Sequence, residues 1–375
     1  MIRAVLLFLG LTAGLCATEF RGAWVATVYN IDWPSKPGLS AGEQQAELRT
    51  MFDRAKSIGL NAILFQVRPT GDAVYSSKIE PWSGFISGSQ GVDPGYDPLE
   101  FAVREAHARG LELHAWFNPF RAATKVEGPF AKNHVVRTHP EWVRRHGSLL
   151  WIDPGEPGAR EYVLSIVLDV VRRYAVDGVH IDDYFYPYPA KGVKDFADDS
   201  SWQRHGAATG LSRGDWRRDN INRFVGTLYK EVKAVKPKVK IGISPFGIYR
   251  PGVPATIEAG LDAYGSLYCD PKVWLERGWC DYLAPQLYWS IEPAKQSFPV
   301  LLDWWRAQSK PGCSIWPGIA TGRIGSARPA KEIAEQIKLT RKGTDAPGHI
   351  HWSMKSLMQD RGGIAELLKK GVYSN

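Results

Sequence analysis

The stretch Val176-Asp177-Gly178-Val179-His180-Ile181-Asp182-Asp183 contains a tight turn, a short apolar strand and two consecutive carboxyl groups. The glycine follows an amphipathic segment, and glycine just after a helix supplies the left-handed conformation that ends it. In a strand, side chains two residues apart share a face, so apolar and polar residues alternate here between the two faces. The stretch therefore predicts a strand that begins after a helix and carries acidic residues at its carboxyl end.

The same order of strand and helix recurs along the chain. Strand-like apolar runs occupy residues 22–28, 61–67, 111–117, 178–182, 239–244, 282–288, 314–319 and 349–353. Amphipathic, helix-like segments occupy residues 42–58, 98–109, 158–174, 217–235 and 330–342. Alternation of this kind implies parallel strands, and eight repeats favour a closed barrel over an open sheet. We therefore predict an α/β fold, a (β/α)₈ TIM barrel that forms a single domain over residues 18–375.

The connections that follow the second, third and fourth strands are long. They cover residues 70–97, 119–152 and 184–215, and they are rich in Trp, Tyr, Pro and Gly. In a barrel, the loops that follow the strands gather on one face and carry the functional residues. The chain contains 15 Trp and 15 Tyr. Their rings either stack on the C–H faces of sugars or simply fill the core and surface.

The first residues have the pattern of a secretory signal peptide. A positive start at Arg3 precedes an almost wholly apolar run at residues 4–15, which is too short for a typical membrane-spanning helix. We predict a signal peptide at residues 1–17 and an exported protein, periplasmic or extracellular, with no membrane span. Cys16 permits a lipid anchor, but Leu15 before it is larger than the residue that such sites prefer.

Net charge narrows the range of partners. The formal charge of +8 becomes +7 in the mature chain, because Arg3 is the only charged residue in the predicted signal peptide. A basic exported protein could be drawn to an acidic polymer such as a cell-wall glycan, although generic surface charge is an equal alternative. Lys and Arg form no dense run, so nucleic acid is not an expected partner.

Three cysteines remain in the mature chain, at positions 269, 280 and 313. An oxidising compartment permits a disulfide between Cys269 and Cys280, which would close a short loop, and free buried thiols are the alternative. The sequence contains neither a CxxC nor an HExxH motif. We therefore expect no metal and no cofactor.

The two consecutive carboxyl groups at the end of the fourth strand are the candidate catalytic groups. Asp182 shares a strand face with His180 and should point into the mouth of the barrel, where Asp183 can turn inward beside it. Mutual repulsion raises the pKa of one member of such a pair and can separate an acid from a base. The alternative is that one of them caps a loop or pairs with an arginine.

Seven motifs in order make the chain resemble a known family. They are residues 20–28 (FRGAWVATV), 32–34 (DWP), 65–69 (FQVRP), 72–77 (DAVYSS), 115–121 (AWFNPFR), 177–189 (DGVHIDDYFYPYP) and 284–289 (APQLYW). Together they cover nearly the whole mature chain, which resembles the glycosyl-hydrolase-like family 10 of bacterial exported proteins. The resemblance implies a barrel with one catalytic domain, export, and activity on glycosidic bonds. The implied substrate is bacterial cell-wall glycan, peptidoglycan in particular, stripped of its peptides.

A second resemblance bears on mechanism. The pattern DGVxID that ends at Asp182 looks like the fourth-strand motif of chitinase-type barrels, in which a Glu two residues further on is the acid. Here Tyr184 occupies that position. Asp182 could still orient an N-acetyl group for substrate-assisted attack, with Asp183 as the proton donor. Alternatively, Asp182 is the nucleophile and the acid comes from another loop, for which Glu292 is a candidate.

The side chains expected to bind substrate lie at or near the ends of several strands: Arg68, His114, Asn118, Arg121, His180, Tyr184, Gln286, Tyr288 and Trp352. Arg68 could hold a carboxylate, such as the lactyl group of muramic acid, or form an ion pair with one of the two aspartates. Asn118 could hold a sugar hydroxyl, and Gln286 and Tyr288 could reach the acetamido group. Trp352 is either a stacking floor for the central sugar or part of the core.

Three hypotheses remain. The first is a glycoside hydrolase acting on an N-acetylhexosamine-containing polysaccharide, through Asp182 and Asp183. The second is a non-catalytic glycan-binding barrel, which Tyr184 in the place of the acid supports. The third is a metal-dependent hydrolase or deacetylase built on His114, His180 and Asp182, although two histidines without a third spaced ligand are more typical of a hydrogen-bonded interior.

Overall fold

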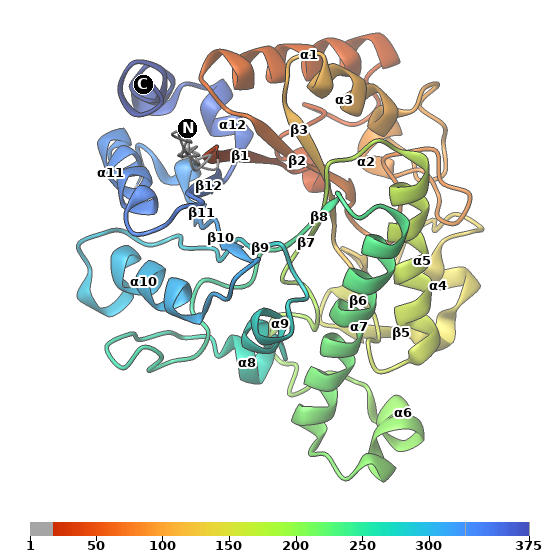
Figure 1. Cartoon of the computed structure of the whole chain (residues 1–375). Helices are drawn as coiled ribbons and strands as arrows, with labels where there is room; N and C mark the ends of the chain where they lie inside the picture. The colour runs from red at the N-terminus through yellow and green to blue at the C-terminus, as the bar shows by residue number, and fades with distance from the viewer. Residues whose placement is uncertain (1–17, 327, 375) are drawn as a thin grey trace, which may run out of the picture.

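The computed structural model describes residues 18–326 and 328–374. The signal peptide predicted at residues 1–17, with the lipid anchor considered at Cys16, lies outside these residues. Figure 1 shows short strands around the middle of the molecule and helices outside them. The main sheet has the order β10-β9-β8-β7-β3-β2-β1-β12-β11, and all of its pairings are parallel.

The strands of this sheet follow the predicted runs. They are β1 (Phe20–Val25), β2 (Ala62–Arg68), β3 (Glu112–Phe117), β7 (Gly178–Ile181), β8 (Lys240–Ile243), β9 (Tyr282–Leu283), β10 (Ser314–Ile315), β11 (Gly318–Ile319) and β12 (Gly348–His351). The sixth strand was predicted to reach residue 288 but is regular only over Tyr282–Leu283. Pro285 follows it and has no N–H to donate to a ladder, which shortens the regular pairing.

The two end strands of the sheet close it into a barrel. β10 pairs with β9 and β11 pairs with β12, and only Trp316 and Pro317 separate β10 from β11. The Trp316 N–H donates to the Leu283 carbonyl at 2.9 Å, and the Gly318 N–H donates to the Pro285 carbonyl at 2.9 Å. β10 and β11 are therefore two halves of the seventh of eight strands. The predicted fold class, a TIM barrel, is confirmed.

The five predicted helices are present around the barrel: α1 (Ala41–Ser57), α3 (Pro98–His107), α5 (Pro157–Arg173), α7 (Arg213–Val235) and α11 (Ala330–Arg341). Local chemistry sets where some of them begin. Ser40 and Glu43 form a reciprocal capping box at α1, and the Asp97 carboxyl accepts from the first backbone N–H groups of α3. α7 begins earlier than predicted, because the Ser212 side chain accepts from the Asp215 N–H and caps the first turn.

The sequence did not predict the remaining helices. The longer two are α9 (Pro271–Arg277) and α10 (Phe298–Gln308), and α10 covers the sixth and seventh strands in Figure 1. The short ones are α2 (Gly84–Ser87), α4 (Val135–Thr138), α6 (Asp199–Ser201), α8 (Ala263–Ser266), α12 (Met354–Met358) and α13 (Ile364–Leu367). Three of the short helices, α2, α4 and α6, lie within the long connections, which are therefore partly ordered by their own secondary structure.

The loop after β3 contains a small antiparallel sheet. Its strands are β4 (Arg121–Ala123), β5 (Val143–His146) and β6 (Leu149–Ile152), in the order β4-β6-β5. Gly147, with a φ of 60°, allows the tight turn between β5 and β6. Trp151 is fully buried, and its indole N–H donates to the Phe185 carbonyl at 2.9 Å. This contact joins the loop after β3 to the loop after β7.

Aromatic rings fill the interior of the barrel. Phe20 stacks on Trp316 with ring centroids 4.1 Å apart, and Tyr282 lies 4.7 Å from Trp316. Leu64 and Ile350 from neighbouring strands belong to the same buried cluster. A filled interior leaves room for a ligand only beyond the ends of the strands.

The structure also bears on the cysteines and on membrane association. Cys269, Cys280 and Cys313 are buried free thiols, and the sulfur of Cys280 lies 3.1 Å from that of Cys313. The disulfide considered between Cys269 and Cys280 is therefore wrong, because Cys280 points toward a different cysteine. Within residues 18–326 and 328–374, no helix combines the length and apolar character needed to cross a membrane.

Candidate active site

A hollow of about 240 Å³ opens at the carboxyl ends of the strands. It is lined by Trp24, Trp116, Asp182, Asp183, Tyr184, Tyr188, Ser244, Gln286, Tyr288 and Trp352. These residues lie in or just after the first, third, fourth, fifth, sixth and eighth strands. The hollow therefore lies on the face of the barrel where enzymes of this fold carry their chemistry.

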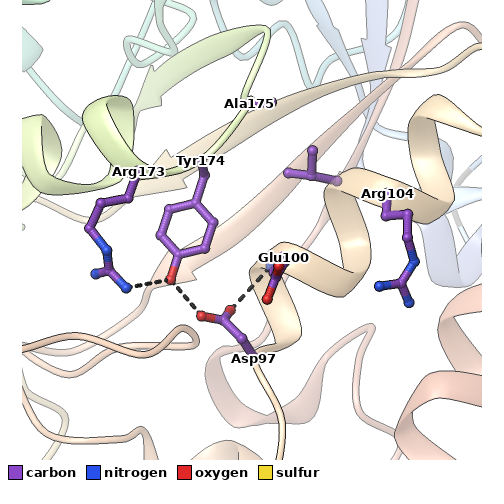
Figure 2. A pocket seen from close by; sticks show the side chains of 7 residues that line it. Asp97, Glu100, Arg104, Arg173, Tyr174 and Ala175 are labelled. Atoms are coloured by element: carbon purple, nitrogen blue, oxygen red, sulfur yellow. Dashed lines mark hydrogen bonds between the residues drawn. The ribbon is translucent and has the colours of Figure 1, made fainter.

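A larger hollow, of about 430 Å³, lies on the outer side of the barrel between α3 and the end of α5 (Figure 2). Two of its charged groups, Asp97 and Arg173, are already used within the protein. Asp97 accepts from the backbone N–H groups of Leu99 and Glu100 and from the Tyr174 hydroxyl. Arg173 donates to Tyr174 and pairs with Asp169. We therefore place the candidate active site in the smaller hollow.

Asp182 and Asp183 are both buried in the wall of this smaller hollow, with exposed fractions of 6% and 1%. One Asp182 oxygen accepts from the Asp183 N–H at 2.8 Å, and the other lies 3.4 Å from the Asn118 side-chain nitrogen. One Asp183 oxygen accepts a short hydrogen bond from the Tyr188 hydroxyl. Each carboxyl therefore has its own hydrogen-bonding partner and a fixed orientation.

The two carboxyl groups differ in acidity. Burial raises the pKa of Asp182, but hydrogen bonds to it and the positive charge of Arg121 oppose this rise. Burial also raises the pKa of Asp183, well above its ordinary value, and the negative charge of Asp182 raises it further. Asp183 is therefore the member of the pair that keeps its proton, and Asp182 is the member that carries the negative charge.

Aromatic rings form the floor beside this pair. The Trp352 ring lies 6.0 Å from Trp24, 6.1 Å from Trp116 and 6.5 Å from Tyr288, measured between centroids. Trp352 is half-buried, so part of its surface faces the hollow. The indole N–H of Trp116 is buried beside Asp182 and favours the carboxylate form of that side chain. The floor thus offers apolar faces to a ligand.

The two predicted histidines lie below the hollow and do not line it. His180 is fully buried, with Nδ1 3.0 Å from the Tyr282 hydroxyl and Nε2 3.1 Å from the Trp24 indole nitrogen. Burial lowers its pKa well below the ordinary value, so the ring is neutral. His114 contacts the same Tyr282 hydroxyl at 2.8 Å and Glu112 at 3.0 Å.

These contacts use the ring nitrogens of His114 and His180 within the protein. The structure therefore does not bring His114, His180 and Asp182 together as a set of metal ligands. In residues 18–326 and 328–374, no group of three or more His, Cys, Asp or Glu side chains is arranged to hold a metal ion.

Arg68 lies outside the hollow. Its guanidinium forms a two-point ion pair with Glu80, at 2.8 and 2.7 Å, and donates to the carbonyls of Asn118 and Pro119. It therefore meets neither of the two aspartates, and it is fully buried. Arg68 joins the loop after β2 to the loop after β3.

Arg121 influences the Asp182 carboxyl group through its charge. Its side chain donates to the Pro69 carbonyl at 3.1 and 3.2 Å, and its guanidinium carbon lies 4.8 Å from the centroid of the Tyr184 ring. Its positive charge favours the carboxylate form of Asp182. Arg121 therefore acts on the hollow through Tyr184 and through the charge of Asp182.

The remaining predicted residues gather at the hollow, with one exception. Tyr184, Gln286 and Tyr288 line it, and the Gln286 amide donates to the Ser244 carbonyl at 3.0 Å. Asn118 lies next to Asp182, and its side-chain oxygen has no partner within the described part of the chain. The exception is Glu292, which is exposed and not among the lining residues.

Comparison with known proteins identifies the family. Residues 19–334 match the model of the family described as "Glycosyl hydrolase-like 10". The chain belongs to this family. The predicted resemblance and the predicted enzyme class, a glycoside hydrolase, are confirmed, and membership supports a carbohydrate substrate.

Two relatives with curated names cover most of the chain. Glycosyl hydrolase YngK of Bacillus subtilis (strain 168) is 40% identical over 369 residues, which span 95% of this chain and 72% of that protein. Glycosyl hydrolase DigH of Escherichia coli (strain K12) is 36% identical over 326 residues, which span 81% of this chain and 74% of that protein.

A solved structure shows the same fold. The PgaB (BpsB) glycoside hydrolase domain from Bordetella bronchiseptica superposes with a TM-score of 0.62, over 95% of this chain and 100% of that domain. Its sequence identity is 13%, so the likeness concerns the fold alone.

Sequence reasoning missed four residues that line the hollow of this family member: Trp24, Trp116, Tyr188 and Ser244. The strand alternation contained a usable signal for Trp116, which lies two residues after His114 on the same face and nearer the carboxyl end of β3. No pattern indicated Tyr188, because it lies in an irregular loop segment between two prolines.

Proposed function

We propose that this glycoside hydrolase cleaves glycosidic bonds in an N-acetylhexosamine glycan, namely bacterial peptidoglycan freed of its peptides. Asp182 and Asp183 are the reacting carboxyl groups. The observation that carries the proposal is their pairing. Two buried carboxyl groups lie side by side at the fourth-strand end, and their surroundings favour the proton on one and the negative charge on the other. Glycoside hydrolysis requires such an acid and such an anion.

In the proposed reaction Asp183 is the acid. It gives its proton to the oxygen of the leaving sugar while the bond from that oxygen to the anomeric carbon breaks. The acetamido oxygen of the substrate attacks the anomeric carbon, and the Asp182 carboxylate accepts a hydrogen bond from the acetamido N–H and orients the group. A water molecule then opens the cyclic intermediate, adding its oxygen to the anomeric carbon and returning a proton to Asp183.

The lining of the hollow suits an N-acetylated sugar. An acetamido group carries both a donor and an acceptor. Beside Asp182, whose carboxylate is an acceptor, the Asn118 side-chain oxygen is a second acceptor without a partner within the described residues, and the buried Trp116 indole N–H favours the carboxylate form of Asp182. Trp352 and Tyr288 offer ring surface to the apolar face of a pyranose. These groups support an aminosugar over an unsubstituted hexose.

The cellular location is part of the proposal. The apolar run at residues 4–15 supports export to the periplasm or the extracellular space, where peptidoglycan lies. The formal charge of +7 on the mature chain supports attraction to an acidic cell-wall polymer.

A non-catalytic glycan-binding barrel is the second candidate. Tyr184 in the position of the chitinase acid supports it, and so does the engagement of Asp183 by Tyr188. The two candidates differ in what they predict for products rather than for binding.

Product release from peptidoglycan tests the proposal. The mature protein and its Asp182→Asn and Asp183→Asn variants are incubated with intact and with peptide-free peptidoglycan, and mass spectrometry identifies the products. We expect short glycan fragments from the peptide-free material with the wild type, and a loss of about 10²- to 10⁴-fold in each variant. Glu292→Gln is the matched control, since this exposed acid lies outside the hollow and its removal should leave the rate unchanged.

The new reducing end of the fragments names the bond that is cut. Glycan that is bound by the wild type but never cut would reject hydrolysis and favour the binding barrel.

A further inference from the structure

A second hollow, of about 140 Å³, shares a wall with the candidate active site. The wall is the segment 182–189 that follows β7. Asp182, Asp183, Tyr184 and Tyr188 line the first hollow, and Tyr186, Pro187 and Pro189 line the second. The opposite side of the second hollow comes from β5 and α8. The two hollows are therefore neighbours, separated by one layer of chain.

His146 of β5 lines the second hollow and contacts this wall. Its Nε2 lies 2.9 Å from the Tyr188 carbonyl, and the hydroxyl of the same Tyr188 donates to Asp183. A carbonyl oxygen only accepts, so Nε2 carries the hydrogen of this contact. Nδ1 is buried and has no partner in residues 18–326 and 328–374. It is the ring atom left to meet a polar group of a ligand.

The available charge in the second hollow is positive. Lys194 and Asp195 both line it. Asp195 pairs with Arg217, through contacts of 2.7 and 3.1 Å, and Arg217 also pairs with Asp198, which Arg213 contacts as well. Lys194 is exposed and forms no ion pair with any residue that the structure describes. An incoming carboxylate would therefore find an uncommitted ammonium group there.

The far wall of the second hollow is preformed. Arg217 donates to the Tyr268 hydroxyl at 2.5 Å, which fixes the Tyr268 ring at the edge of the hollow. Tyr186 packs edge-on against Tyr268 and Phe196, with ring centroids 5.0 and 5.3 Å apart. Rings held by other rings and by a buried arginine lose little freedom when a ligand binds, so the hollow can bind a ligand without rearranging.

We propose that the second hollow is a saccharide subsite for a sugar unit that bears a free carboxylate, with Lys194 as its counter-ion. This inference rests on the proposed function. In peptidoglycan freed of its peptides, the lactyl group of muramic acid ends in such a carboxylate. In a peptide-bearing strand the same carbon is an amide, so the charge is gone and a peptide chain follows. The subsite would therefore select the peptide-free glycan.

The position of this subsite differs from the sequence-based expectation. The sequence offered Arg68 either for the lactyl carboxylate or for an ion pair with one of the two aspartates, and Glu80 and two backbone carbonyls occupy its guanidinium instead. In this proposal Lys194, and not Arg68, provides the positive charge for the carboxylate. Lys194 lines the second hollow, on the other side of the segment 182–189 from the hollow that Asp183 lines.

The test compares three glycans of equal length by isothermal titration calorimetry. They are a peptide-free muramyl oligosaccharide, the same oligosaccharide with its lactyl carboxylate converted to a simple amide, and a chito-oligosaccharide without lactyl groups. The proteins carry Asp182→Asn to prevent cleavage. We expect the carboxylate form to bind about tenfold more tightly than the amide form, an advantage that salt reduces.

Lys194→Met should abolish this advantage and leave the affinity for the chito-oligosaccharide unchanged. Lys191→Met is the matched control, because this exposed lysine lies in the same loop but does not line the hollow. Ser266→Trp, which fills the hollow from α8, should abolish the advantage as well.

Each outcome separates the subsite from the proposed function. An unchanged carboxylate advantage in Lys194→Met overturns the subsite, even if the wild type cuts the glycan. A carboxylate advantage that Lys194→Met removes supports the subsite, even if the wild type releases no products and the proposed hydrolysis fails. Absence of binding to all three glycans overturns both.

Discussion

The Tyr188 hydroxyl donates its hydrogen bond to Asp183 and not to Asp182. Burial and the negative charge of Asp182 raise the pKa of Asp183 well above its ordinary value, and the Tyr188 hydrogen bond opposes them because it stabilises the carboxylate. The balance of these effects sets the pH at which Asp183 loses its proton. Tyr188 is thus a positioning residue that also limits how far this pKa rises.

Tyr188→Phe should move the alkaline limb of the pH dependence of kcat/KM to higher pH. The proposed acid works only while protonated, and without the hydroxyl its pKa rises further. A hydrogen bond to a charged group accounts for a shift of about one pH unit. The pH profile of kcat/KM on peptide-free glycan measures it.

Tyr184→Phe is the matched control for that profile. Tyr184 lines the same hollow but donates no hydrogen bond to Asp183 within the described residues, so the limb should stay in place. An equal shift in both variants, or none in Tyr188→Phe, would refute the role given to Tyr188.

Asp183→Asn should make the protein more stable and less active. The substitution keeps the shape of the side chain and removes a buried ionisable group beside the Asp182 carboxylate. We expect the free energy of unfolding to rise by about 1 kcal/mol while activity falls. Urea unfolding checks it, with Asp53→Asn, an exposed carboxyl, as the control that should change little. Lower stability in Asp183→Asn would contradict the prediction.

Arg68→Met should destabilise the fold without weakening substrate binding. It leaves the Glu80 carboxylate buried without its partner, which costs about 3–5 kcal/mol. The double variant Arg68→Met/Glu80→Met removes both charges and should recover part of that loss, while KM stays near the wild-type value. Urea unfolding and steady-state kinetics on the double variant measure the two quantities. If the double variant recovers its stability but its KM rises strongly, Arg68 contributes to substrate binding after all.

Asp72→Asn should change how stability depends on pH. Burial raises the pKa of Asp72 to about 6 in the folded protein. The protonated form is therefore favoured by folding, and this stabilisation is present below pH 3.8 and is lost as pH rises through about 6. The wild type should lose about 2 kcal/mol relative to Asp72→Asn between pH 4 and pH 7. Chemical unfolding across that range checks it, and a difference that stays constant with pH would count against this account.

Periodicity along the chain was sufficient to predict the barrel. Apolar runs followed by amphipathic segments predicted the strands and five of the longer helices, because burial against the sheet imposes both patterns. The prediction failed where another constraint dominates. Pro285 ends the regular part of β9 early, and the short helices within the long connections depend on contacts from distant segments.

The site was predictable only in part. Alternation along a strand gives the face of a side chain but not its depth in the barrel. His114, near the amino end of β3, is therefore buried below the hollow, whereas Trp116 on the same face lines it. Glu80, the partner of Arg68, and Tyr188, the partner of Asp183, lie in irregular loops. Loops have no regular repeat of side-chain direction from which these contacts could be predicted.

The pairing of β1 with β12 also bears on how the chain folds. Phe20 of β1 lies beside Gly348 of β12. One edge of β1 therefore stays unpaired until β12, one of the last strands of the chain, has been synthesised. The Tyr373 hydroxyl, which contacts His349 and His351, is later still in the chain. Until then the sheet has two edge strands with unpaired backbone groups, and such strands promote aggregation. The pairing of β1 with β12 is also the longest-range pairing of the sheet, and pairings between segments far apart in the chain slow folding.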